Sequence, residues 1–107
     1  MSGPPDSPGQ DSQAYSFTRE LGLTHAEFHR SLPPAVDYHP FTVENDRVQI
    51  DYGERNVTIE LGAQQQRSIA SLRLPYVEVR FTFVGFSTPE REDFMERFER
   101  YFQRGGG

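Results

Sequence analysis

The fold of this chain is decided by residues 77–102, which read VEVRFTFVGFSTPEREDFMERFERYF. Apolar and polar residues alternate over residues 77–83, and this period of two predicts a strand with one buried face. Ser87 followed by Glu90 is a capping-box pattern, which predicts that a helix begins at this point. An apolar stripe at helical spacing follows, made of Phe94, Met95, Phe98, Tyr101 and Phe102. We therefore expect this strand and this helix to pack against each other, with Phe98 at the centre of the contact.

The composition limits the classes of protein to which the chain can belong. Its 107 residues suffice for one domain, and its formal net charge of −5 argues against a general binder of nucleic acid or of anionic membranes. The absence of cysteine excludes disulfides and thiolate metal sites. The sequence contains neither a signal-peptide pattern nor an apolar run of membrane-spanning length. A bacterial cytoplasmic protein is the expectation that fits these features.

The two ends of the chain differ in composition from the part between them. Residues 1–13 are rich in Ser, Pro, Gly, Asp and Gln, so we expect a disordered tail. Residues 14–104 are expected to form the single domain, and residues 105–107 a flexible glycine tail that begins with Gly105 as a helix cap. The weak alternation of residues 14–20 fits either a short edge strand or an extended lead-in to the domain.

A second helix is predicted near the N-terminus of the domain. Thr24 and Glu27 form a capping-box pattern, and Leu23 and Phe28 are placed as a hydrophobic staple across it. We expect this helix to stop at residues 33–34, which are two prolines, because proline restricts the residue before it and removes a backbone donor.

Four alternating segments follow this helix, at residues 47–52, 56–61, 67–74 and 77–83. Gly53 and Glu54 fit a two-residue hairpin loop of type II′, and residues 41–43 are a fragment that can join the strand after it. Pro75 leaves two alternatives open, a tight turn between two strands or a bend within one long strand. We favour the turn, because one strand through this proline would exceed the usual length of about 3–10 residues.

The order helix, four strands, helix predicts an α+β domain of two layers. The sheet is expected to be a four-stranded antiparallel meander with both helices on one face, and with a further short strand if residues 14–20 pair. The residues expected to point toward the helices are Val48, Ile50, Val57, Ile59, Leu72, Val79 and Phe81. We expect Phe98 to face the last two of these.

His25 and His29 are the only residues whose spacing suggests a metal site. Four positions apart on a helix, they share one face, and His39 with Asp37 could complete a ligand set. The surrounding sequence HAEFH lacks the glutamate that zinc proteases carry directly after the first histidine. An exposed polar helix face is the simpler interpretation.

No pattern in the sequence indicates a catalytic centre. No serine lies in a G-x-S-x-G motif, and no glycine-rich loop stands between a strand and a helix where it could bind phosphate. The carboxylates of Glu90, Glu92 and Asp93 fall in the first turn of the last helix, where they favour the helix dipole. We therefore name no catalytic residue and expect no cofactor.

The face of the sheet away from the helices is the predicted working surface. Arg73 and Arg80 are expected to converge there from adjacent strands, with Glu78 and Arg47 nearby, and Arg suits directional contacts with a protein. The leading hypothesis is a small non-enzymatic binding or accessory module that contacts another protein or a second copy of itself, and neither nucleic acid nor a membrane. The alternative is a small metal-dependent enzyme or ligand-binding protein that uses His25 and His29.

Overall fold

The computed structural model of this protein describes residues 14–106, so the tail predicted for residues 1–13 lies outside the described residues. Within that range the chain forms six strands and two helices, in an α+β arrangement. In chain order these are β1 (Ala14–Leu21), α1 (His25–Ala35), β2 (Phe41–Glu44), β3 (Arg47–Tyr52), β4 (Arg55–Leu61), β5 (Gln65–Ile69), β6 (Leu72–Val84) and α2 (Thr88–Gly106).

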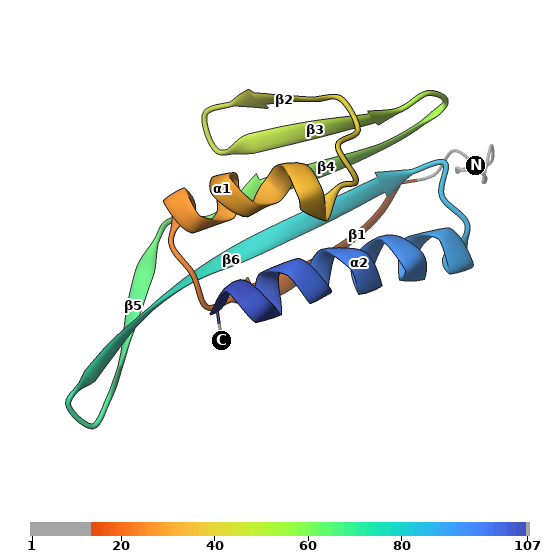
Figure 1. The fold of residues 1–107 in the computed structure, drawn as a ribbon. Coiled ribbons are helices and arrows are strands. Elements are labelled where there is room, and N and C mark those ends of the chain that lie inside the picture. The colour runs from red at the N-terminus through yellow and green to blue at the C-terminus, as the bar shows by residue number, and fades with distance from the viewer. Residues whose placement is uncertain (1–13, 107) are drawn as a thin grey trace, which may run out of the picture.

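All strand pairs are antiparallel, and β6 lies at the centre of the sheet. The order across the sheet is β1-β6-β4-β3-β2, and β5 pairs with the first part of β6 beyond the main sheet. Both helices lie on the same side of the sheet, and β6 runs the length of the molecule (Figure 1). The antiparallel α+β class is confirmed, but the expected count of four strands is wrong.

The two extra strands come from segments that the sequence left open. Residues 14–20 do form an edge strand, because Ala14 to Leu21 pair residue by residue with Val84 to Val77 of β6. The fragment at residues 41–43 is a strand of its own rather than part of the next one. It is separated from β3 by a turn in which Asn45 has a positive φ of 56°.

The prediction of a turn at Pro75 is wrong. β6 runs through this proline as one strand of 13 residues, and the turn lies earlier, at residues 70–71, with Ala70 at φ 55°. Pro75 is tolerated because β1 ends opposite Val77, so no strand is present on that side to accept a bond from the missing N–H. The sheet therefore gains a two-stranded extension, made of β5 and the first five residues of β6, which we call the arm.

Both predicted capping boxes are confirmed. The Thr24 hydroxyl accepts from the Glu27 N–H at 3.1 Å, and the Glu27 carboxylate accepts from the Thr24 N–H at 2.9 Å. Ser87 and Glu90 exchange the same two bonds at 3.3 and 2.8 Å. Contrary to the prediction, α1 does not stop at its prolines but continues to Ala35. Each proline removes one internal hydrogen bond, but the end of the helix is closed by the N–H groups of residues 36–38, which donate to the carbonyls of residues 32–34.

The end of α2 also differs from the prediction. The helix continues to Gly106, so two of the three glycines that we expected to form a cap and tail are helical. Tyr101 is 36% exposed and lies beside Arg97, with the guanidinium 5.5 Å from the ring centroid, so it is not part of the buried stripe.

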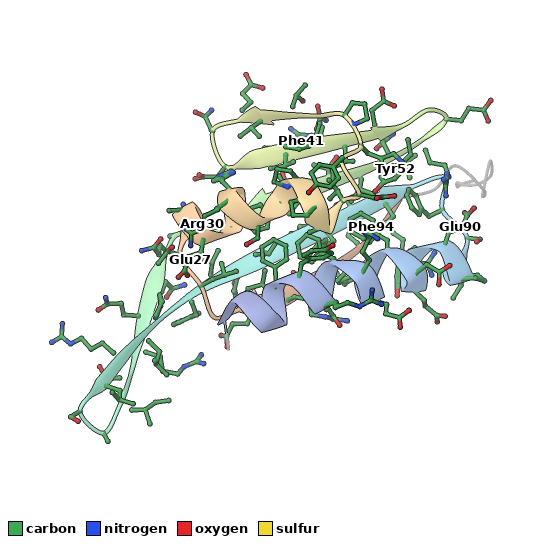
Figure 2. The ribbon with its side chains drawn as sticks, viewed as in Figure 1. Glu27, Arg30, Phe41, Tyr52, Glu90 and Phe94 are labelled. Carbon is green, nitrogen blue, oxygen red and sulfur yellow. The ribbon has the colours of Figure 1, made fainter. Side chains whose placement is uncertain are left out.

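The core lies between the helices and the sheet and is rich in aromatic rings (Figure 2). Phe98 is fully buried, and its ring meets that of Phe81 edge-on, with the centroids 5.0 Å apart. The predicted contact between α2 and the last strand is thus confirmed. The predicted inward residues of β3, β4 and β6 are buried as expected, with the exception of Leu72, which is 59% exposed because it lies on the side of β6 that faces away from the helices.

Candidate functional site

The open face is the side of the main sheet that neither helix covers. Its residues alternate with the buried ones along each strand, and the strand register aligns them in rows. These residues are Ser16, Thr18, Glu20, Thr42, Glu44, Arg47, Gln49, Asp51, Asn56, Thr58, Glu60, Glu78, Arg80 and Thr82. Apart from Ala14 and Val84, which pair at one end of it, the face is polar, as the sequence predicts.

One row of the open face alternates in charge across four strands. Arg80 of β6 lies opposite Glu60 of β4, which lies opposite Arg47 of β3, which in turn lies opposite Glu44 of β2. All four side chains are exposed, and among the described residues no ion pair within 4.0 Å joins any two of them. Their charged groups are thus available to an external partner.

Arg73 does not lie beside Arg80, contrary to the prediction from the sequence. It belongs to the same strand as Arg80, seven residues earlier, so about 23 Å of extended backbone separates them. Seven is an odd number, and Arg73 therefore shares its side of β6 with Val77 and Val79, which face the helices. The expected convergence of Arg73 and Arg80 is wrong, because it required a turn at Pro75 that the chain does not make.

The arm exposes an apolar cluster made of Ile69, Leu72 and Leu74. Their side chains are 51%, 59% and 43% exposed. Ile69 pairs with Leu72 across the arm, and Leu74 follows two positions later on the same strand, so all three share one side. Figure 1 shows that the arm extends beyond both helices, and within residues 14–106 no other element buries this cluster.

Leu72 and Leu74 continue the open face along β6. Both have even residue numbers, as Glu78 and Arg80 do, and therefore lie on the same side of β6 as these two. The odd-numbered residues Val77 and Val79 face the helices instead. The apolar cluster and the polar open face therefore lie on the same side of one continuous strand. We call the combination of the apolar cluster with Arg47, Glu78 and Arg80 the docking surface.

The arm is anchored to the main sheet by Arg67 of β5. Its guanidinium donates two hydrogen bonds to the Glu20 carboxylate, at 3.0 and 2.8 Å, and lies 4.4 Å from the centroid of the Tyr76 ring. These hydrogen bonds from Arg67 lower the pKa of Glu20. The bidentate geometry fixes the direction of a two-stranded element that would be marginally stable by itself.

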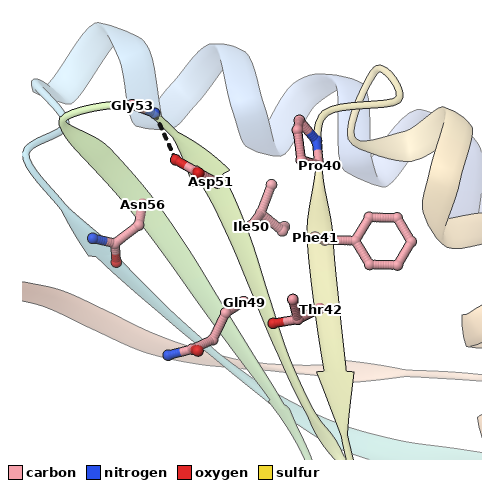
Figure 3. A pocket seen from close by; sticks show the side chains of 8 residues that line it. All are labelled: Pro40, Phe41, Thr42, Gln49, Ile50, Asp51, Gly53 and Asn56. Carbon is pink, nitrogen blue, oxygen red and sulfur yellow. Dashed lines mark hydrogen bonds between the residues drawn. The ribbon is translucent and has the colours of Figure 1, made fainter.

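A hollow of about 440 Å³ lies at the β2–β3 end of the sheet (Figure 3). Thr42, Gln49 and Asn56 bring a hydroxyl and two amide groups to it from three strands. The Asp51 carboxylate, which also lines it, accepts a hydrogen bond from the Gly53 N–H at 2.8 Å and so holds the β3–β4 turn. The hollow is open and polar, and it widens the open face rather than enclosing a ligand.

The ring of His25 is engaged by the protein itself. Its Nε2 donates to the Gly62 carbonyl at 2.8 Å, and its Nδ1 lies 3.7 Å from a carboxylate oxygen of Asp46. His29 packs edge-on against the Phe28 ring, with the centroids 5.5 Å apart. A metal bound through Nε2 of His25 would have to displace the bond to Gly62, whereas Nδ1 could bind a metal without breaking that bond.

The other proposed ligands are not brought to this pair. His39 bonds through Nδ1 to the Val36 carbonyl at 2.9 Å and lies against the Tyr52 ring, while the Asp37 carboxylate accepts from Arg97 at 3.2 Å. Among residues 14–106, no group of three or more His, Cys, Asp or Glu side chains is placed to hold a metal ion.

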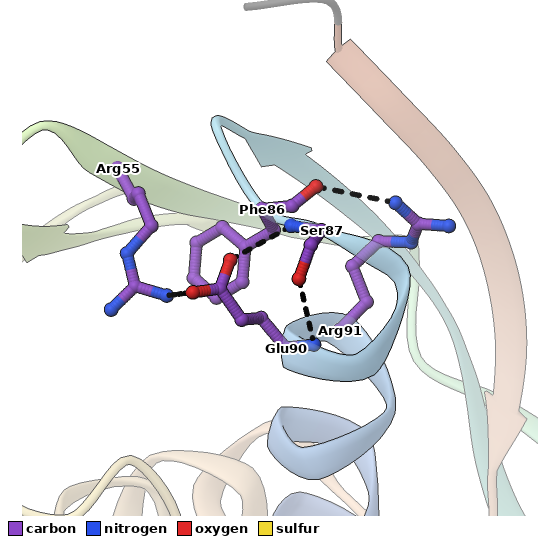
Figure 4. Close-up of polar contacts among 5 residues, drawn as sticks. All are labelled: Arg55, Phe86, Ser87, Glu90 and Arg91. Atoms are coloured by element: carbon purple, nitrogen blue, oxygen red, sulfur yellow. Dashed lines mark hydrogen bonds and ion pairs between the residues drawn. The ribbon is translucent and has the colours of Figure 1, made fainter. Parts of the chain in front are cut away.

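The start of α2 forms a compact polar corner (Figure 4). The Glu90 carboxylate, which completes the capping box, also pairs with Arg55 at 3.1 Å. Its pKa is lowered, chiefly by the bond from the Ser87 backbone N–H. Arg91 donates to the Phe86 carbonyl at 3.4 Å and places its guanidinium 3.7 Å from the centroid of the Tyr15 ring. These groups hold the helix start against the sheet.

Comparisons with known protein families, with curated proteins and with solved structures found no match for this chain. No helix within residues 14–106 combines the length and the apolar character needed to cross a membrane. The geometry of the chain is therefore the basis on which its function is inferred.

Proposed function

We propose that this chain is a small non-enzymatic binding module that contacts another protein through the docking surface. The observation that carries the proposal is the exposure of Ile69, Leu72 and Leu74 on an arm that projects from the domain. Seven large hydrophobic residues of the described range are exposed, and three of them gather here while the other four are scattered. A cluster of this kind is typical of a surface that another protein covers.

The composition of the docking surface supports a protein partner. Interfaces commonly combine a few apolar anchors with a polar rim that excludes water. The apolar cluster supplies the anchors, and Glu78, Arg80 and Arg47 supply polar groups of both charges farther along the same side of the sheet. A nucleic-acid partner is disfavoured by the net charge of −5 and by the carboxylates that alternate with the arginines.

The stability of the arm points in the same direction. A two-stranded hairpin is marginally stable in water, and this one is held to the sheet through Arg67 and Glu20. A partner that buried the apolar cluster would stabilise the arm, as a packed helix stabilises an ordinary sheet. The cytoplasmic location expected from the sequence is part of the proposal, since a chain without cysteine makes no use of an oxidising compartment.

Capture of partners by the purified protein tests the proposal. The variant Leu72→Ser with Leu74→Ser should lose its specific partner, because truncating an interface anchor typically costs at least about 2 kcal/mol, or roughly 30-fold in affinity. Val43→Ser is a matched control, since Val43 is 47% exposed on β2 and lies outside the docking surface. Arg80→Glu tests the polar groups separately.

Both arm residues are exposed, so the circular dichroism spectrum of the double variant should match that of the parent. Quantitative mass spectrometry of the proteins retained from a native lysate gives the comparison. If the parent and the arm variant retain the same proteins in the same amounts, the apolar cluster is not a docking site and the proposal fails.

A further inference from the structure

The two outer edges of the main sheet are protected to very different degrees. β2 is an edge of four residues that directly follows Pro40. β1 is an edge of eight residues, paired with β6 without interruption and containing neither proline nor glycine. Long edge strands without a bulge or a proline are templates for pairing with another strand. Within the described residues, β1 is thus the main-sheet edge that remains open to such pairing.

The backbone groups that β1 presents outward can be assigned from the register. The Glu78 carbonyl of β6 accepts from the Gly62 N–H at 2.8 Å, so even-numbered residues of β6 direct their backbone groups away from β1. The odd-numbered residues of β6 therefore bond to β1, where their register partners are its odd-numbered residues. It follows that the N–H and C=O groups of Ser16, Thr18 and Glu20 point out of the sheet.

We propose that this edge pairs with β1 of a second copy, antiparallel about a twofold axis at Thr18. Thr18 then lies opposite Thr18 of the second copy, and Ser16 lies opposite its Glu20. Every outward N–H and C=O of these three residues finds a partner, because antiparallel hydrogen-bonded pairs recur at every second residue. The same surface patch serves both copies, as a twofold interface requires. The proposal is independent of the docking surface, which lies on the face rather than the edge of the sheet.

The charges of β1 select Thr18 as the centre. Side chains keep to the same sheet faces only if the axis passes through a residue. An axis at Arg19 would oppose two arginines, and an axis at Phe17 would bring Arg19 to the Tyr15 ring that Arg91 already covers at 3.7 Å. With the axis at Thr18, Arg19 lies opposite Phe17 of the second copy, a contact that repeats its present position 4.8 Å from its own Phe17 ring.

A hollow of about 300 Å³ beside the edge supports the second copy as the occupant. It lies between β1 and α2 and is lined by Tyr15, Phe17 and Arg19 on one side and by Arg91 and Met95 on the other. The proposed register places Leu21 of the second copy opposite Tyr15 and its Phe17 opposite Arg19, so apolar side chains arrive next to the hollow. Glu20, the remaining charged residue of β1, is already bonded to Arg67. In the proposed register it lies opposite Ser16 of the second copy, which carries no charge.

Proline substitution tests the pairing with the purified chain alone. Thr18→Pro removes an outward N–H that the isolated domain does not use, so the fold should be retained while the dissociation constant of the dimer rises by about tenfold or more. Thr18→Ala keeps the N–H and should dimerise like the parent. Sedimentation equilibrium over a wide concentration range measures the mass, and circular dichroism checks the fold. A parent that stays monomeric at its highest soluble concentration overturns the proposal.

Single cysteines test the register without weakening the fold, since the chain contains no cysteine of its own. Thr18→Cys should form a disulfide between two copies under mild oxidation, because residues directly opposite each other lie about 5.5 Å apart at Cα. Ser16→Cys is the matched control on the same strand and face, and it should stay reduced because two copies of residue 16 are four positions out of register. Equal cross-linking of both variants, or none by Thr18→Cys, contradicts the proposed pairing.

Discussion

Replacement of Phe98 by alanine should cost more stability than any change on the surface of the helix. The Phe98 ring is fully buried and contacts those of Phe28, Phe81, Phe94 and Phe102, with centroid distances of 6.1, 5.0, 5.8 and 4.3 Å. Truncation removes a ring from the point where both helices meet β6, and the backbone of the sheet prevents the cavity from closing. Changes of this kind cost about 3–5 kcal/mol, out of a total of about 5–15 kcal/mol for a domain.

Thermal and urea unfolding of Phe98→Ala measure this cost. At about 4–8 °C per kcal/mol for a domain of this size, the melting temperature should fall by about 12–40 °C. Tyr101→Ala is the matched control, because Tyr101 lies on the same helix but is 36% exposed, and it should change the melting temperature by only a few degrees. Equal melting temperatures for the two variants would refute the assignment of Phe98 to the centre of the core.

Three further predictions concern ionisable groups. Burial raises the pKa of Tyr52 to about 12, so the parent should lose stability relative to Tyr52→Phe as the pH rises from about 10 to 12, measured by urea unfolding. The pKa of Glu20 is lowered by Arg67, so this bond stabilises the arm above the ordinary pKa of a glutamate and is lost as the pH falls through the lowered value. The protection of the amides of residues 65–69 against exchange, relative to their intrinsic rates, should therefore fall in acid, and in Glu20→Gln it should be low already at neutral pH. Zinc should bind weakly or not at all, since within residues 14–106 no group of three or more ligand side chains is placed to hold it, and sub-micromolar zinc affinity lost in His29→Ala would contradict this.

The features that the sequence predicted correctly are those set by neighbouring residues. Both capping boxes depend on a hydroxyl and a carboxylate three positions apart, and they form as expected at Thr24 and Ser87. The alternation that buries Val79 and Phe81 likewise follows from the geometry of a single strand. Contacts between residues close together in the chain decide these features, so the sequence alone is enough to predict them.

The position of the arm could not be predicted in the same way. Proline is a strong local signal and predicts the turn at Pro75, whereas the actual turn uses Ala70, a residue without special turn propensity, at a positive φ. The consequence for the candidate site was large, because it moved Arg73 to the opposite side of β6. Pro75 fits within β6 because the strand is unpaired on one side at this point. That depends on where β1 ends in the folded sheet, and no pattern within the strand reveals it.

The apolar cluster was missed for a related reason. A turn at Pro75 would place Leu72 and Leu74 on the side of the helices. Because β6 is continuous, both leucines instead share the side of Glu78 and Arg80, which no helix covers. The side on which they lie thus depends on where the strand turns.

The pairing of β1 with β6 also constrains the order in which the sheet can form while the chain is being synthesised. The partners of Ala14–Leu21 are Val77–Val84, which a ribosome adding about 5–20 residues per second makes several seconds later. The meander of β2, β3 and β4 has its local partners within that interval, but β1 does not. A nascent chain that has not yet emerged beyond β4 thus holds its first strand without a template, and closure of the sheet is a late event in synthesis.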